Sequence, residues 1–132
     1  MTRAETAAAQ KHPRIDIALE IARACVRACD DKKGEEIKVL DVRTSLAISD
    51  YFVLVTGKNR RHLRSMADEI RRLLHGFRRS PPREEGGHDE SGRWILLDLG
   101  DVIVHLFDHE TRRFYALDAL WADAPVVKIA AD

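Results

Sequence analysis

The strongest constraint on the fold is a pair of apolar runs joined by a short turn. The runs cover residues 94–99 and 102–107, and Gly100-Asp101 lies between them. Runs of β-branched and aromatic residues on either side of such a turn predict a β-hairpin. Both alternating sets of side chains in the second run are mostly apolar, as in a strand that is covered on both faces. The chain therefore needs packing layers on both sides of a sheet.

The side chains of the first run alternate between two different faces. Trp94, Leu96 and Asp98 share one face, whereas the residues between them are wholly apolar and are expected in the core. Trp94 has two interpretations. It is either a core tryptophan under the helices or an exposed contact residue for a partner.

Two amphipathic helices are predicted from apolar residues that recur every three or four positions. The first covers residues 14–33 and carries Cys25 and Cys29 on its apolar stripe, where we expect reduced, buried thiols. Two cysteines at this spacing are neither a CxxC pair nor a four-ligand zinc site. The second helix is expected from Asn59, a residue type that commonly caps helices, to about Gly76.

The remaining segments complete an α/β (α+β) fold. Strands are expected at residues 37–42 and 51–56, and a short edge strand at the start of the connector 80–92. A short helix is expected at residues 114–121, before Pro125. This order of elements predicts one mixed β-sheet flanked by helices.

The chain length fits a single domain. With 132 residues, 45% of them hydrophobic, the chain can bury one core and is too short for two ordinary domains. We expect this domain at residues 14–123, between a flexible N-terminal extension (1–13) and a C-terminal tail (124–132). No apolar run approaches the roughly 20 residues of a membrane-spanning helix. The protein is therefore expected in the cytoplasm, without membrane contact.

Charge is unevenly distributed along the chain, although 22 basic residues balance 22 acidic ones. Residues 58–83 contain nine Lys or Arg against two Asp or Glu, and residues 84–132 contain four against eleven. The zero sum argues against a protein that coats nucleic acid by bulk charge. The acidic last third instead suits a basic partner.

The second predicted helix has a basic face opposite its apolar stripe. Such a face is usually just the solvated side of a helix. Several arginines on one face can also bind a phosphate backbone without reading its sequence. The candidates for RNA contact are Arg60, Arg61, Arg64 and Arg71. An RNA-binding module of this kind remains an alternative function, and it would bind naked RNA with a steep salt dependence.

Seven short blocks of sequence occur in one order along the chain. They are DVR (41–43), SDYFV (49–53), TG (56–57), EG (85–86), WILLD (94–98), GDVIVH (100–105) and FYALDALW (114–121). Together they resemble the Iojap family, the ribosomal silencing factors, over roughly residues 14–123. The resemblance is specific because many blocks occur in one order.

The resemblance implies a sheet of nucleotidyltransferase-like shape and a protein that represses translation. Such a protein binds the large ribosomal subunit through the ribosomal protein numbered fourteen, on the face where the small subunit joins. Occupying that face blocks subunit joining sterically and lowers translation when nutrients are scarce. An auxiliary contact with ribosomal RNA and a homodimer of the free protein both stay open.

Partner-binding residues are predicted in the acidic last third. Trp94 is the natural anchor, because a large aromatic side chain at the centre of an interface commonly carries much of the binding energy. Acidic neighbours such as Asp98 are suited to Lys or Arg of the partner. Asp118 stands where the family usually has Glu, so a salt bridge there needs a closer partner. The full set is Trp94, Leu96, Asp98, Asp101, Val104, His105, Tyr115 and Asp118.

An enzyme of the nucleotidyltransferase class is the other alternative, because a fold alone does not decide function. Phosphoryl transfer needs carboxylates close together for divalent metal and a loop that holds phosphate. The sequence has no Asp-x-Asp motif, and Gly57 is not in a Gly-Ser pair. His105 is predicted as a packed histidine with one hydrogen bond. His109 beside Asp108 offers too few ligands for a metal, so we predict no catalysis, no metal and no cofactor.

Overall fold

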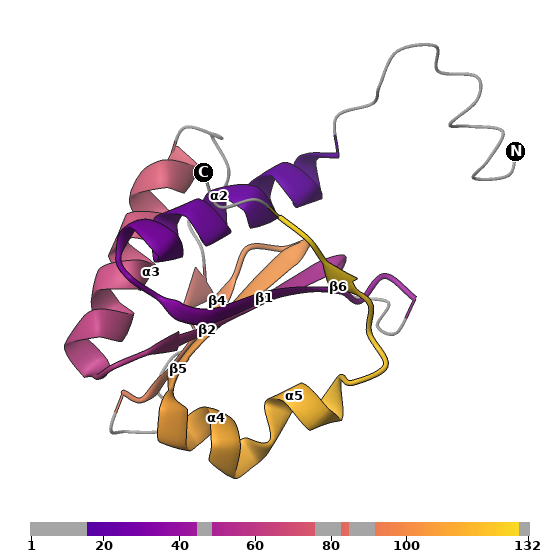
Figure 1. Ribbon diagram of the computed structural model, residues 1–132. Helices are drawn as coiled ribbons and strands as arrows, with labels where there is room; N and C mark the ends of the chain where they lie inside the picture. The colour runs from indigo at the N-terminus through magenta and orange to yellow at the C-terminus, as the bar shows by residue number, and fades with distance from the viewer. Residues whose placement is uncertain (1–15, 45–48, 76–82, 85–91, 130–132) are drawn as a thin grey trace, which may run out of the picture.

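Six strands form one mixed sheet in the computed structural model, which describes residues 16–44, 49–75, 83–84 and 92–129. Their order across the sheet is β3-β4-β5-β2-β1-β6 (Figure 1). The strands β2 and β5 run parallel, and the other neighbouring pairs are antiparallel. The strands are Glu35–Asp41 (β1), Tyr51–Gly57 (β2), Arg83–Glu84 (β3), Trp94–Asp98 (β4), Val102–Asp108 (β5) and Val126–Val127 (β6). The predicted mixed sheet and its hairpin are confirmed.

Helices cover both faces of this sheet. The helices α2 (Ile17–Asp31) and α3 (Arg60–Leu74) pack on one face, and α4 (His109–Tyr115) and α5 (Leu117–Leu120) lie on the other (Figure 1). The predicted cap of α3 is confirmed, because the Asn59 side chain accepts a hydrogen bond from the backbone N–H of His62 at 2.8 Å. None of the helices within the described ranges is both long and apolar enough to cross a membrane.

The main core lies between the sheet and the pair α2 and α3. Ile95 and Leu97 of β4 are buried there, as their alternation with Trp94 predicts. Cys25 and Cys29 are also buried there as free thiols, and burial raises the pKa of Cys25 to about 12. A smaller cluster lies under α4 and α5 and contains Leu40, Val42, Phe52, Leu54, Phe107, Leu117 and Ala124.

Two predictions for the C-terminal part of the chain are wrong. The helix expected at 114–121 begins earlier, at His109, because the Asp108 side chain accepts a hydrogen bond from the Thr111 backbone N–H at 2.8 Å and caps α4. A left-handed Ala116, with φ 49°, then separates α4 from α5. The expected tail 124–132 is part of the fold as far as residue 129, because β6 pairs with β1 at the sheet edge. The extension expected at 1–13 lies outside the described residues.

Candidate partner-binding site

Trp94 lies on the sheet face that α4 and α5 cover only in part. Within the β4–β5 pair, Trp94 lies opposite Phe107 and Leu96 lies opposite His105. Trp94, Leu96 and Asp98 are all half-buried, whereas the β4 residues between them are buried under α2 and α3. Trp94 is therefore not a core tryptophan under those two helices. It packs against the smaller core cluster under α4 and α5, and part of the residue stays exposed.

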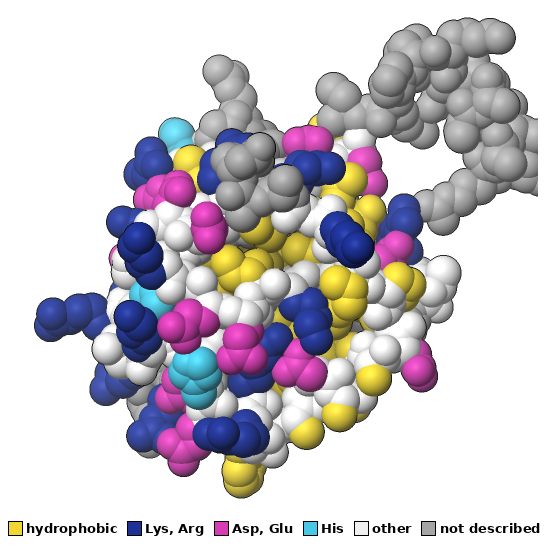
Figure 2. Space-filling model, in the orientation of Figure 1, with side chains coloured by type: hydrophobic (Ala, Val, Ile, Leu, Met, Phe, Trp, Pro, Cys, Tyr) yellow, Lys and Arg dark blue, Asp and Glu magenta, His cyan; other side chains and the backbone are white. Residues whose placement is uncertain are grey.

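Exposed apolar side chains of α4 and α5 lie on the same side of the sheet as Trp94. The Trp94 and Tyr115 ring centroids are 5.0 Å apart, and Tyr115 in turn contacts Phe114. Phe114 is 78% exposed and Leu120 is 66% exposed. Figure 2 shows hydrophobic side chains along the lower edge of the molecule, where Figure 1 places α4 and α5. We call Trp94, Phe114, Tyr115, Leu120 and the half-buried Trp121 the aromatic rim; exposed apolar patches of this kind commonly mark interaction sites.

His105 supports Trp94 from beneath. The Trp94 indole N–H donates a hydrogen bond to His105 Nδ1 at 3.3 Å, and only 4% of His105 is exposed. Burial lowers the pKa of His105 to about 4, so the ring is neutral at neutral pH and can accept at Nδ1. The expected packed histidine with one hydrogen bond is confirmed. The partner contact predicted for His105 is wrong, because the ring is covered by its neighbours.

Two further residues of the predicted set lie away from Trp94. Val104 is fully buried against α2 and α3, so the partner contact predicted for it is wrong. The reason is strand alternation, which places Val104 and His105 on opposite faces. Asp101 is exposed in the β4–β5 turn, at the end of the hairpin away from Trp94. Of the set, Leu96 and Asp98 share the sheet face of Trp94, and His105 and Tyr115 contact its ring.

Asp118 is an internal ion-pair partner. Arg112 Nε and Nη2 donate to its two carboxylate oxygens at 2.8 and 2.9 Å, and Lys38 Nζ donates at 3.0 Å. The Arg112 side chain is only 6% exposed, and its Nη1 donates to the Glu36 carbonyl and the Thr56 hydroxyl, each at 2.8 Å. The hydrogen bonds from Arg112 and then Lys38 hold the pKa of Asp118 well below its usual range. One buried guanidinium therefore ties α4 and α5 to β1 and β2.

Four residues of this region were not predicted from the sequence: Arg112, Phe114, Leu120 and Trp121. Arg112 lies in a charged stretch that is typical of a solvated surface, so no local signal marks its burial. Phe114 and Leu120 have apolar side chains, which usually predict burial. The available signal was the short length of α4 and α5, because a helix of one or two turns covers little of a sheet.

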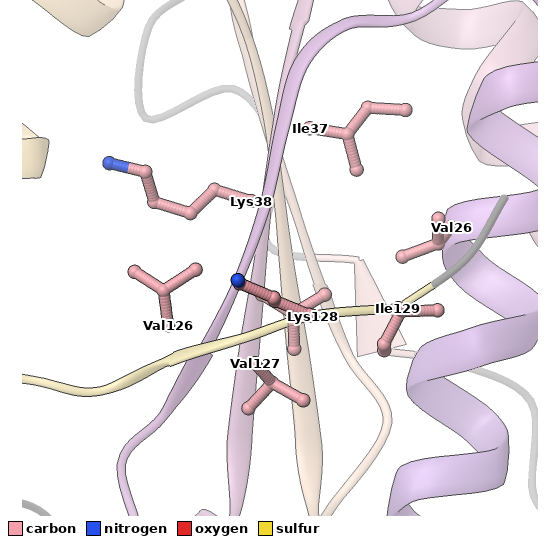
Figure 3. A pocket seen from close by; sticks show the side chains of 8 residues that line it. Val26, Ile37, Lys38, Val126, Val127, Lys128 and Ile129 are labelled. Atoms are coloured by element: carbon pink, nitrogen blue, oxygen red, sulfur yellow. The ribbon is translucent and has the colours of Figure 1, made fainter.

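Two open cavities lie outside the aromatic rim. One, of about 560 Å³, is lined by Val26, Ile37, Lys38, Val39, Val126, Val127, Lys128 and Ile129 (Figure 3). Its charged groups are both ammonium groups, so this lining offers no acid–base pair. The other, of about 510 Å³, is lined by Lys58, Asn59, Arg60, Arg61, Arg93 and Asp108. Among the described residues, no cluster of three or more His, Cys, Asp or Glu side chains could hold a metal ion.

Comparison with known proteins decides the family. Residues 15–132 match the family described as "Ribosomal silencing factor during starvation". The chain belongs to this family. The ribosomal silencing factor of Halalkalibacterium halodurans is 36% identical over 110 residues, which cover 83% of this chain and 92% of that protein. A crystal structure of a Chromobacterium violaceum protein is similar with a TM-score of 0.73 and 28% identity, over 87% of this chain and 93% of that one.

A protein of Mus musculus is also similar to this chain. It is named mitochondrial assembly of ribosomal large subunit protein 1 and is 29% identical over 106 residues, 76% of this chain and 46% of that protein. The predicted family is confirmed, and with it a role in regulating translation at the level that the family name describes. The contact roles of single residues stay predictions.

Proposed function

We propose that the chain represses translation by binding the large ribosomal subunit through the aromatic rim and keeping the small subunit off. The proposed partner is the large-subunit ribosomal protein numbered fourteen, on the face where the small subunit joins. Membership of the silencing factor family supports the ribosome as the target. The mouse relative, by its name, supports the large subunit.

The position of the half-buried Trp94 beside α4 is the observation that carries this proposal. Its ring is held by the hydrogen bond to His105 and by contact with Tyr115. A side chain that is already fixed loses little conformational entropy when a partner binds. Because its indole N–H is paired within the protein, the ring can also be buried at an interface without leaving an unpaired donor.

The charge of the last third of the sequence favours a basic partner. Ribosomal proteins are generally basic, and residues 84–132 contain eleven acidic residues against four basic ones. Complementary charge raises the association rate and excludes wrong partners more than it raises affinity. Salt should therefore slow association with the large subunit, while the aromatic rim holds the complex together.

Steric exclusion requires occupancy of a surface and no chemical step. The function proposed for this chain therefore needs neither a nucleophile nor a metal. Arg112 and Asp118 have a positioning role in it, because their ion pair fixes the two helices that carry most of the aromatic rim.

Sedimentation with purified ribosomal particles tests the proposal. The chain should cosediment with large subunits, and it should be absent from the fractions of small subunits and of joined ribosomes. Lys38→Gln, which changes an ion pair beside the rim and leaves the rim itself intact, serves as a variant that should keep this distribution. Equal cosedimentation of the chain with all three particles would contradict the proposal.

A further inference from the structure

A second candidate site lies at the carboxyl ends of the two parallel strands. The last residues of β2 and β5, Gly57 and Asp108, are paired neighbours. From this point β2 leads into α3 on one face of the sheet, and β5 leads into α4 on the other (Figure 1). In open α/β sheets, ligands bind preferentially in the crevice at such a switch point. The cavity of about 510 Å³ lies here.

Cationic side chains dominate the lining of this cavity. Arg93 lies 3.6 Å from Asp108, the single carboxylate of the lining, and that carboxylate also caps α4. Lys58, Arg60 and Arg61 have no ion-pair partner among the described residues. Figure 2 shows Lys and Arg side chains gathered over the left part of the molecule, where Figure 1 places α3. Arg93 also pairs with Glu110 at 3.5 Å, outside the lining, so the net positive charge of the cavity comes from Lys58, Arg60 and Arg61.

The arginines in the last turn of α3 are paired with acidic residues of the same helix. Arg71 pairs with Asp68 at 3.2 Å, and Arg72 pairs with Glu69 at 2.6 Å. The first turn, in contrast, contains no acidic residue. Cations at a helix N-terminus oppose the helix dipole, so helix stability does not account for basic residues at this end. A bound anion would account for them.

The lining also indicates which anion fits. None of the described residues around the cavity has an aromatic or apolar side chain on which a nucleobase could stack. Guanidinium groups match the geometry of phosphate oxygens and can bind them through two hydrogen bonds. The chemistry is that of a phosphate group held without recognition of its base. Arg93 directly precedes Trp94, so the cavity lies at the end of β4 that carries Trp94.

We propose that this cavity binds backbone phosphates of RNA beside the protein contact made by Trp94. The inference deepens the proposed function. It rests on that function in one respect, since the RNA is taken to be the RNA on the surface of the large subunit. It also narrows the RNA contact predicted for the whole basic face of α3. The contact residues become Lys58, Arg60, Arg61 and Arg93, and Arg64 and Arg71 are left out because they do not line the cavity.

Binding of a labelled RNA hairpin, followed by fluorescence anisotropy at several salt concentrations, tests this site. The double variant Arg60→Gln/Arg61→Gln should bind about tenfold more weakly than the wild type. Its plot of log K against log salt concentration should be less steep by about 2, because two phosphate contacts are lost. The matched variant Arg71→Gln/Arg72→Gln removes the same charge from the other end of α3 and should change neither quantity.

Three outcomes would overturn the inference. The first is a wild-type chain that does not bind the hairpin, and the second is an equal loss in both double variants, which indicates bulk charge alone. The third is displacement of the RNA by ATP at a concentration far below the concentration of inorganic phosphate that displaces it. That result indicates a nucleotide site. Trp94→Ala separates this inference from the proposed function. It should leave binding to the hairpin unchanged and weaken binding to large subunits.

Discussion

Replacing Trp94 with alanine should weaken binding of the chain to large ribosomal subunits by about 2 kcal/mol, or about 30-fold in Kd. The ring is held by the hydrogen bond to His105 and by contact with Tyr115 at 5.0 Å. Truncation removes the apolar area that the ring offers a partner. It also removes the contact between Trp94 and Tyr115. Sedimentation over a range of subunit concentrations gives the two affinities.

The control for this prediction is Leu73→Ala. Leu73 is also a half-buried apolar side chain, but it belongs to α3 and packs on the opposite side of the sheet. This variant should keep the affinity of the wild type. Thermal unfolding of both variants shows whether they are folded. A folded Trp94→Ala variant that binds as tightly as the wild type would make Trp94 a structural residue and contradict its role as an anchor.

Replacing Arg112 with alanine should lower the free energy of unfolding by about 3 kcal/mol. The change leaves the buried Thr56 hydroxyl and the Glu36 carbonyl without their donor, and it removes the main partner of Asp118. The value lies at the lower end of the range for broken buried ion pairs, because Asp118 is partly exposed and keeps Lys38. Urea denaturation measures this difference.

Arg113→Ala is the matched control, because Arg113 follows Arg112 on α4 and is exposed. It should change the unfolding free energy by no more than about 0.5 kcal/mol. Arg112→Lys should recover only part of the loss, since an ammonium group lacks the planar fork that meets the Asp118 carboxylate. Equal stability of the Arg112→Ala and Arg113→Ala variants would show that the buried guanidinium does not fasten α4 and α5.

The sequence predicts those parts of the fold that depend on short-range patterns. Strand alternation separates Trp94 from the buried residues of β4, and the Asn59 cap marks the start of α3. These features are decided by residues within a few positions of one another. The same alternation rule shows that Val104 and His105 cannot both contact one partner, because adjacent strand residues point to opposite faces.

The missed features depend on contacts between distant parts of the chain. The burial of Arg112 is decided by Thr56 and Glu36, which lie 56 and 76 positions away in the sequence. The strand β6 exists because β1 offers it an edge, although residues 126–127 are too few to predict a strand by periodicity. The same holds for Asp118. Its shorter arm was expected to need a close partner, and the fold supplies Lys38, 80 positions away in the sequence, at 3.0 Å in addition to the nearby Arg112.

The most direct test of the central claim is a light-scattering measurement of subunit joining, in which the chain is mixed with large subunits before small subunits are added. Large subunits that have been premixed with the chain should join added small subunits to a lower extent than free large subunits do. Trp94→Ala should need about 30-fold more protein for the same effect, in line with its weaker binding. Undiminished joining, with the chain still bound to the joined ribosomes, would contradict the claim that it keeps the small subunit off.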